Sequence, residues 1–136
     1  MQFRVVTGNT ARNPVARAIA RQKVHDRLMA AKLRIYLLGK GEDASDFLHG
    51  VMASLLVVGR ALEIEYEGRE HEMPDDVLRD TRVLRGGLSA MQQHFKKWDP
   101  AQAVAAEQGI DACERLNRVA KTQFIEQASR ETGLLR

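Results

Sequence analysis

Cysteine is almost absent from this chain, because Cys113 is the only one among 136 residues. An intrachain disulfide is therefore impossible, and a structural zinc site built from several cysteines is excluded. The four histidines are His25, His49, His71 and His94, and no two of them stand three or four positions apart. The chain also lacks the Glu-x-x-His sequence that the di-iron sites of helical bundles require. We therefore expect no bound metal and no other cofactor.

Phosphate-binding and nucleophile motifs are missing as well. Gly39-Lys40-Gly41 is too short for a P-loop, and no Gly-x-Gly-x-x-Gly sequence occurs. Cys113 falls on an apolar helical pattern beside Ile110, which favours a small buried side chain over a reactive thiolate. We expect no catalytic residues, and hence a protein that is not an enzyme.

Aromatic residues make up only 5% of the chain, and glycine and proline number 10 and 3. This composition disfavours a β-sandwich, which uses more aromatic, β-branched and turn residues. The hydrophobic share of 44% and the charged share of 29% are ordinary for a packed domain. Since the length also matches one domain, we expect a single, mainly α-helical domain over residues 1–136.

Long hydrophobic runs are absent. The most apolar stretch, residues 51–59, is much shorter than the roughly 20 residues that cross a bilayer. The first ten residues also lack the apolar region of a secretory signal. We expect a cytoplasmic protein without membrane contact.

Helix boundaries are well marked in this sequence. Asn13-Pro14 and Asp99-Pro100 each place a capping residue before a proline at the first helical position. Apolar residues at spacings of three and four follow these starts. The sequence thus predicts an N-terminal arm over 1–13 and four helices over about 14–38, 45–66, 75–97 and 100–130. Short connections favour antiparallel neighbours, so the predicted fold is a four-helix up-down bundle.

Two segments also fit β-structure. Residues 62–67 alternate apolar and acidic side chains, and Gly68 supplies a turn, so a short β-hairpin near 62–73 is the alternative to a continuing helix. Residues 2–6 at the N-terminus are strand-like as well.

The most regular pattern in the chain is a heptad seam between Val77 and Trp98, with successive spacings of four and three. Such a seam serves a contact inside the bundle or between subunits. The candidate interface residues on it are Leu84, Leu88, Met91, Phe95 and Trp98. Gly86 and Gly87 interrupt the seam at a cost of about 1 kcal/mol each, which indicates either a close backbone contact or a kink.

Charge is distributed unevenly behind a small total of +3. Residues 1–40 hold nine basic residues against Asp26, a net charge of +8, whereas residues 63–80 hold eight acids against Arg69 and Arg79, a net charge of −6. The two segments either attract each other, within the fold or across an oligomer, or they face a charged partner. The candidate contacts with nucleic acid or another anionic partner are Arg12, Arg17, Arg21, Lys23, Arg27 and Arg34.

We therefore expect a small non-enzymatic helical-bundle accessory protein that acts through protein-protein contacts, either as a homo-oligomer or by docking on a protein partner. The alternative is a nucleic-acid-binding protein whose basic N-terminal helix contacts phosphates. No helix-turn-helix, zinc finger or RNP sequence accompanies that helix.

Overall fold

The computed structural model describes the backbone of residues 14–38, 45–93 and 100–134, and the side chains of 15, 17–31, 49–93 and 101–134. Over these ranges the chain is mainly helical, as the sequence predicts, with five α-helices, one short 3-10 helix and no strand. The elements are α1 (Pro14–Leu38), α2 (Ser45–Glu65), η2 (Glu70–Glu72), α3 (Asp75–Gln93), α4 (Pro100–Val119) and α5 (Thr122–Thr132).

The last predicted helix is two helices in the structure. Ala120 still donates its N–H to the carbonyl of Leu116, but Lys121 has extended backbone angles (φ −69°, ψ 133°) and leaves the helix. The carbonyl of Lys121 then accepts hydrogen bonds from the N–H groups of Phe124 and Ile125 in the first turn of α5. The break lets the chain change direction so that α5 packs on α1 and α2.

The β-hairpin that the sequence leaves open near 62–73 is not seen in the described residues, which continue α2 and then turn into η2. Leu62 is 2% exposed and continues the apolar stripe of α2, so helical burial outweighs the alternating pattern. The carbonyl of Leu62 accepts the N–H of Tyr66, after which the chain turns at Gly68 (φ +73°) into η2. The strand-like residues 2–6 lie outside the described residues.

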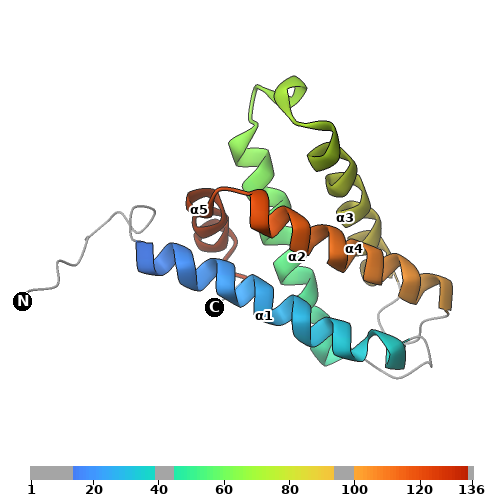
Figure 1. The fold of residues 1–136 in the computed structure, drawn as a ribbon. Coiled ribbons are helices and arrows are strands. Elements are labelled where there is room, and N and C mark those ends of the chain that lie inside the picture. Colours follow the sequence, from blue (N-terminus) through green and yellow to red (C-terminus); the bar gives the residue numbers. More distant parts are fainter. Residues whose placement is uncertain (1–13, 39–44, 94–99, 135–136) are drawn as a thin grey trace, which may run out of the picture.

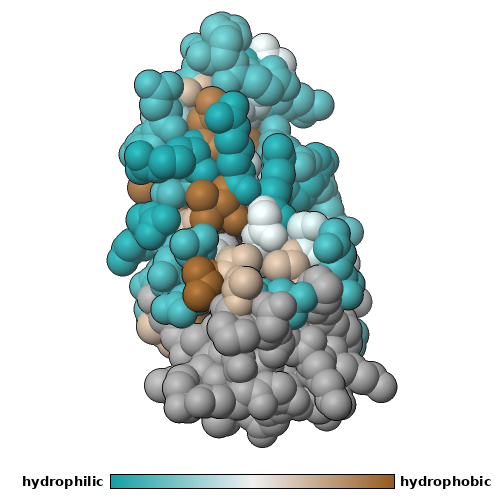
Figure 2. All heavy atoms as spheres, turned by 90° about the vertical axis from the view of Figure 1, so that its right-hand side faces the viewer, coloured by the Kyte–Doolittle hydropathy of each residue, from teal (hydrophilic) through white to brown (hydrophobic). Residues whose placement is uncertain are grey.

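The helices do not form a four-helix up-down bundle. In Figure 1, α1 and α4 run side by side in opposite directions, and α2 crosses behind them instead of lying alongside. Helix α3 packs mainly on α4, while α5 packs on α2 and α1. On the side of the molecule that carries α3, hydrophobic residues form a strip bordered by hydrophilic ones (Figure 2).

The core is formed by one face of each α-helix. It contains, among others, Val24, Leu28, Leu55, Val58, Leu84, Ile110, Leu116 and Ile125, each at most 2% exposed. On α1 the buried face is the one with Ala20, Val24, Leu28 and Ala31. The outward face of the same helix carries Val15 and Ile19, which are 65% and 50% exposed.

Two glycines let α3 and α4 approach closely. A Cβ atom on Gly87 would lie 2.7 Å from Cα of Gly109 and 3.1 Å from the carbonyl oxygen of Ala105. A Cβ on Gly86 would meet nothing within 4 Å. The glycine pair in the seam therefore serves a backbone contact at one position only, and α3 runs through both glycines.

Cys113 is a buried core residue of α4, with 0% exposure and its Sγ 3.8 Å from the carbonyl oxygen of Ser54. Desolvation, with a smaller contribution from Glu114, raises the pKa of its thiol. We expect a thiol reagent at pH 8 to modify native Cys113 at least about 1000-fold more slowly than the urea-unfolded chain, because reaction requires opening of the core. Absorbance kinetics with a chromogenic disulfide measures both rates, and equal rates would contradict the burial.

Candidate functional site

A surface groove runs between α2 and α3, where two clefts adjoin. One cleft of about 380 Å³ opens beside the turn that links the helices, and the other, of about 300 Å³, continues along α3 to Leu88. Both clefts are lined by Gly59, Arg60, Glu63 and Arg85. They form one continuous depression, which we call the α2–α3 groove.

The floor of the α2–α3 groove is apolar. Leu55 and Leu84 lie at its base and are 0% and 2% exposed, whereas Leu56 is 38% exposed and Leu88 is half-buried. Gly59 adds depth, because the nearest atom to a Cβ built there is Cδ2 of Leu84 at 3.8 Å. Leucine side chains at the base and at the edge give the groove a surface that an apolar side chain can cover.

One end of the groove is strongly acidic. Residues 63–76, which we call the acidic tip, hold seven carboxylates against the single cation Arg69. Glu67 and Glu70 from this tip line the larger cleft and are exposed. Tyr66 lies beside them, and desolvation together with Glu65 raises the pKa of its hydroxyl. The groove therefore combines an apolar floor with a negative end.

Arg60, one of the two arginines that line both clefts, is held by two carboxylates. Nε of Arg60 donates to Glu131 on α5 at 3.1 Å, and its Nη1 donates to Glu63 at 3.3 Å. The hydrogen bond with Glu131, followed by that with Glu63, raises the pKa of Arg60. Arg60 therefore offsets Glu63, one of the seven acids of the tip, and leaves the other six against Arg69.

Two of the predicted anion-contact residues bind main-chain carbonyls instead. The guanidinium of Arg21 donates to the carbonyl of Ala120 at the end of α4, and Nδ2 of Asn117 donates to the carbonyl of Arg21 at 3.3 Å. Desolvation lowers the pKa of Arg21. Nη1 of Arg27 donates to the carbonyl of Leu134 at 3.1 Å. Both arginines thus complement the negative C-terminal end of another helix.

The other predicted cations are spread along α1. Arg17 is half-buried and Lys23 is exposed. Arg34 belongs to α1, but its side chain lies outside the described ones, and Arg12 lies outside the described residues altogether.

The acidic segment 63–80 makes its described ion pairs away from α1. Glu63 pairs with Arg60, Glu72 pairs with Arg69, and Asp80 pairs with Arg115. Helix α1 packs on α2, α4 and α5, whereas α3 packs on α2 and α4. These described ion pairs therefore involve arginines outside the basic N-terminal segment.

The predicted seam interface is largely internal. Leu84 and Met91 are 2% and 0% exposed within the core of the chain. Leu88 is half-buried and lines the α2–α3 groove. Phe95 and Trp98 lie outside the described residues.

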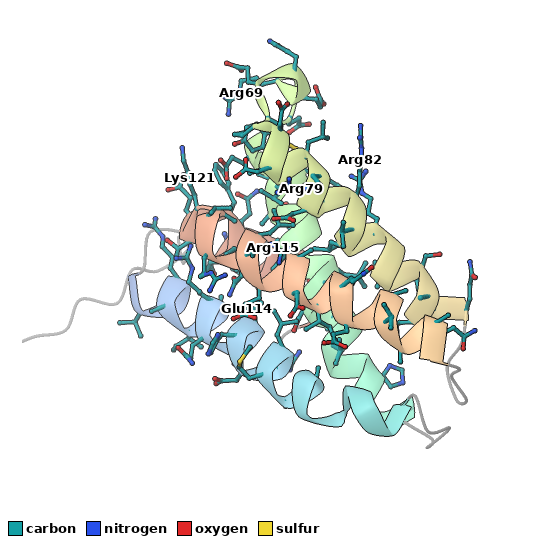
Figure 3. All side chains as sticks on the ribbon, turned by 45° about the vertical axis from the view of Figure 1, so that its right-hand side comes forward. Arg69, Arg79, Arg82, Glu114, Arg115 and Lys121 are labelled. Carbon is teal, nitrogen blue, oxygen red and sulfur yellow. The ribbon has the colours of Figure 1, made fainter. Side chains whose placement is uncertain are left out.

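A second, shallower cleft of about 340 Å³ lies between α3 and α4. Nη2 and Nε of Arg115 donate to the two carboxylate oxygens of Asp80 at 2.9 and 3.1 Å, and Figure 3 shows Arg115 on α4 near Arg79 of α3. The hydrogen bond from Arg115 lowers the pKa of Asp80. Asp111 and Gln108 complete the lining. Acids and arginines are equal in number here, so this cleft carries less charge than the groove.

Sequence reasoning missed most of the groove residues. Leu56 was recognisable only as one of several residues that broaden the stripe of α2, and Gly59 gave no signal of its own. The acidic tip is visible in the sequence as a charge cluster, but the sequence leaves a helix and a hairpin open over residues 62–73, and neither places the cluster at the end of a groove. Burial of Leu62 on α2 in the structure decides between the helix and the hairpin.

Within the described ranges, no group of three or more His, Cys, Asp or Glu side chains is placed to hold a metal ion. None of the helices described there has the length and apolar character needed to cross a bilayer. No protein-family model matches the sequence, and comparisons with curated proteins and with solved structures gave no significant match.

Proposed function

We propose that this chain is a non-enzymatic docking protein whose α2–α3 groove binds an amphipathic helix with basic residues at one end. The observation that carries the proposal is the continuous groove, with leucines on its floor and edge and the acidic tip at its end. Helix-in-groove recognition uses apolar anchors at helical spacing, and charge complementarity fixes the orientation of the ligand.

Protein docking is favoured over nucleic-acid binding because of how the α1 cations are used. Arg21 and Arg27 contact carbonyls within the chain, which withdraws two of the six candidate phosphate contacts. The α2–α3 groove, with leucines on its floor and edge, lies beside acids that would repel phosphates.

The test is a selection of helical peptides from a displayed random library against the full chain. We expect enriched peptides with apolar residues at positions i, i+3 or i+4 and i+7, and with Lys or Arg near one end. Leu56→Asp should weaken their binding at least about tenfold by placing a charge on the apolar floor.

Leu78→Asp is the matched control. Leu78 is 37% exposed on α3, against 38% for Leu56, but it lines neither cleft of the groove. It should leave peptide affinity within about twofold of the parent chain, as expected for a surface substitution outside the site. Equal binding of the peptides to Leu56→Asp, or failure to enrich any such peptide, would overturn the proposal.

A titration with a DNA duplex over a salt series tests the alternative function. The proposal predicts an apparent Kd weaker than about 100 μM at physiological salt, outside the usual range of non-specific binding. Tighter binding that is lost when Arg17 and Lys23 are replaced by Gln would favour the nucleic-acid function instead.

A further inference from the structure

We infer that the groove is occupied by the outward face of α1 from a second copy of this chain, an inference that rests on the proposed function of the groove. The chain then carries both halves of its own interface, one on α1 and one between α2 and α3.

The outward face of α1 is the apolar half of the interface. Val15, Ala18 and Ile19 are all exposed, and together with Gln22 they line an open surface hollow of about 480 Å³. Their spacing of i, i+3, i+4 and i+7 is the one with which an amphipathic helix presents anchors to a groove. We call this surface the α1 patch.

The α1 patch is turned away from the groove of its own chain. The opposite side of α1, with Ala20, Val24 and Leu28, is the side that is buried in the fold. Helix α1 packs on α2, α4 and α5, while the groove opens between α2 and α3. An occupant with the chemistry of the α1 patch must therefore come from another molecule.

Charge favours this pairing and gives it a direction. Between residues 15 and 31, α1 carries Arg17 and Lys23, together with Arg21 and Arg27, which bind carbonyls of the chain but keep their charge, against the single acid Asp26. The acidic tip beside the groove carries seven acids against Arg69. The ion pairs described for the acidic segment are made with arginines outside α1. None of these pairs joins the acidic segment to the cations of α1 in the same chain. Contact between copies brings the two segments together and should weaken as salt rises.

The contact is heterologous, because different surfaces meet on the two copies. Such contacts propagate into chains or close into rings, of which the smallest is a dimer with two reciprocal contacts. The full chain should therefore form a dimer or larger species as its concentration rises.

Complementary variants test this arrangement. Ile19→Asp disables the α1 patch and Leu56→Asp disables the groove, and both residues are partly exposed, so each variant should fold. By light scattering we expect each variant alone to have the 15.3 kDa mass of the monomer. A one-to-one mixture should give a dimer and nothing larger, because only one functional patch and one functional groove remain. Val104→Asp, at a valine of 52% exposure on α4, is the control and should assemble like the parent chain.

Each outcome has a distinct meaning. A parent chain that stays monomeric at millimolar concentration, or a mixture of the two variants that stays monomeric while the parent assembles, would overturn this inference. Selection of basic amphipathic peptides that need Leu56 would still support the groove in the first case, so the two proposals fail separately. If circular dichroism shows that either variant is unfolded, Ile19→Gln and Leu56→Gln replace the pair, and the same masses are expected.

Discussion

Replacement of Gly87 by alanine should lower the free energy of unfolding by about 2 kcal/mol. The new Cβ would stand 2.7 Å from Cα of Gly109, 3.1 Å from the carbonyl oxygen of Ala105 and 3.2 Å from N of Gly109. All three atoms belong to the backbone, so no flexible side chain can yield and α3 must move away from α4. Overpacking costs about 1–3 kcal/mol, and contact with backbone atoms alone puts this case near the upper end, so a loss of about 2 kcal/mol remains after the gain of about 1 kcal/mol in helix propensity.

Gly86→Ala is the matched control for this prediction. The neighbouring glycine lies in the same helix, but its added Cβ would meet nothing within 4 Å. The variant should gain up to about 1 kcal/mol from the better helix propensity of alanine. Urea denaturation followed by far-ultraviolet circular dichroism measures both variants. Unfolding of Gly87→Ala at the same or a higher urea concentration than the parent would refute the close contact.

Replacement of Arg115 by methionine should cost about 1–2 kcal/mol of stability. The side chain of Asp80 is 10% exposed and accepts two hydrogen bonds from Arg115, which is itself 48% exposed. Removal of the arginine leaves the nearly buried carboxylate of Asp80 without these two hydrogen bonds and without the positive charge of Arg115. The aliphatic side chain of methionine preserves much of the packing. Exposure of Arg115 to solvent keeps the cost below that of a fully buried pair.

The same ion pair should make stability depend on pH in the acid range. Because Arg115 holds the pKa of Asp80 below its unfolded value near 4, the contribution is fully present above about pH 4. It is lost as the pH falls through the lowered pKa of the folded protein. The stability difference between the parent chain and Arg115→Met should therefore shrink on acidification below about pH 4.

Arg118→Met is the control for the charge change itself. Arg118 is 66% exposed and lies 3.8 Å from Glu114 one turn earlier on α4. Because Arg118 is itself mostly exposed and its distance to Glu114 is long, the pair contributes about 0.5 kcal/mol or less, and the variant should unfold close to the parent. If chemical denaturation shows equal stabilities for Arg115→Met and Arg118→Met at pH 7, the special role of the Asp80 pair is refuted.

Local signals in the sequence predict much of the helical structure. Proline at residues 14 and 100 marks the first residue of α1 and of α4, because it fixes φ and lacks an N–H that the first turn would leave unpaired. The break between α4 and α5 was not predicted. It has no proline or glycine at Ala120-Lys121, and it depends on tertiary contacts such as the guanidinium of Arg21 on the carbonyl of Ala120.

The candidate site was harder to predict than the helices. Periodicity in the sequence places Leu56 and Leu88 on the apolar faces of their helices. Only the relative placement of α2 and α3 in the fold brings the two residues to the same groove. The same limit applies to α1, whose apolar residues differ in exposure. Val24 and Leu28 are buried, while Val15 and Ile19 are exposed, because α4 and α5 cover one side of the helix.

Amide chemical-shift mapping of the ¹⁵N-labelled chain with a peptide selected for groove binding locates the docking site residue by residue. We expect the largest shifts on residues 55–63 of α2 and 81–88 of α3, and we expect Leu56→Asp to abolish them. Largest shifts on the cleft between α3 and α4, around Gln108 and Asp111, or elsewhere outside the groove, would contradict the assignment of the docking site.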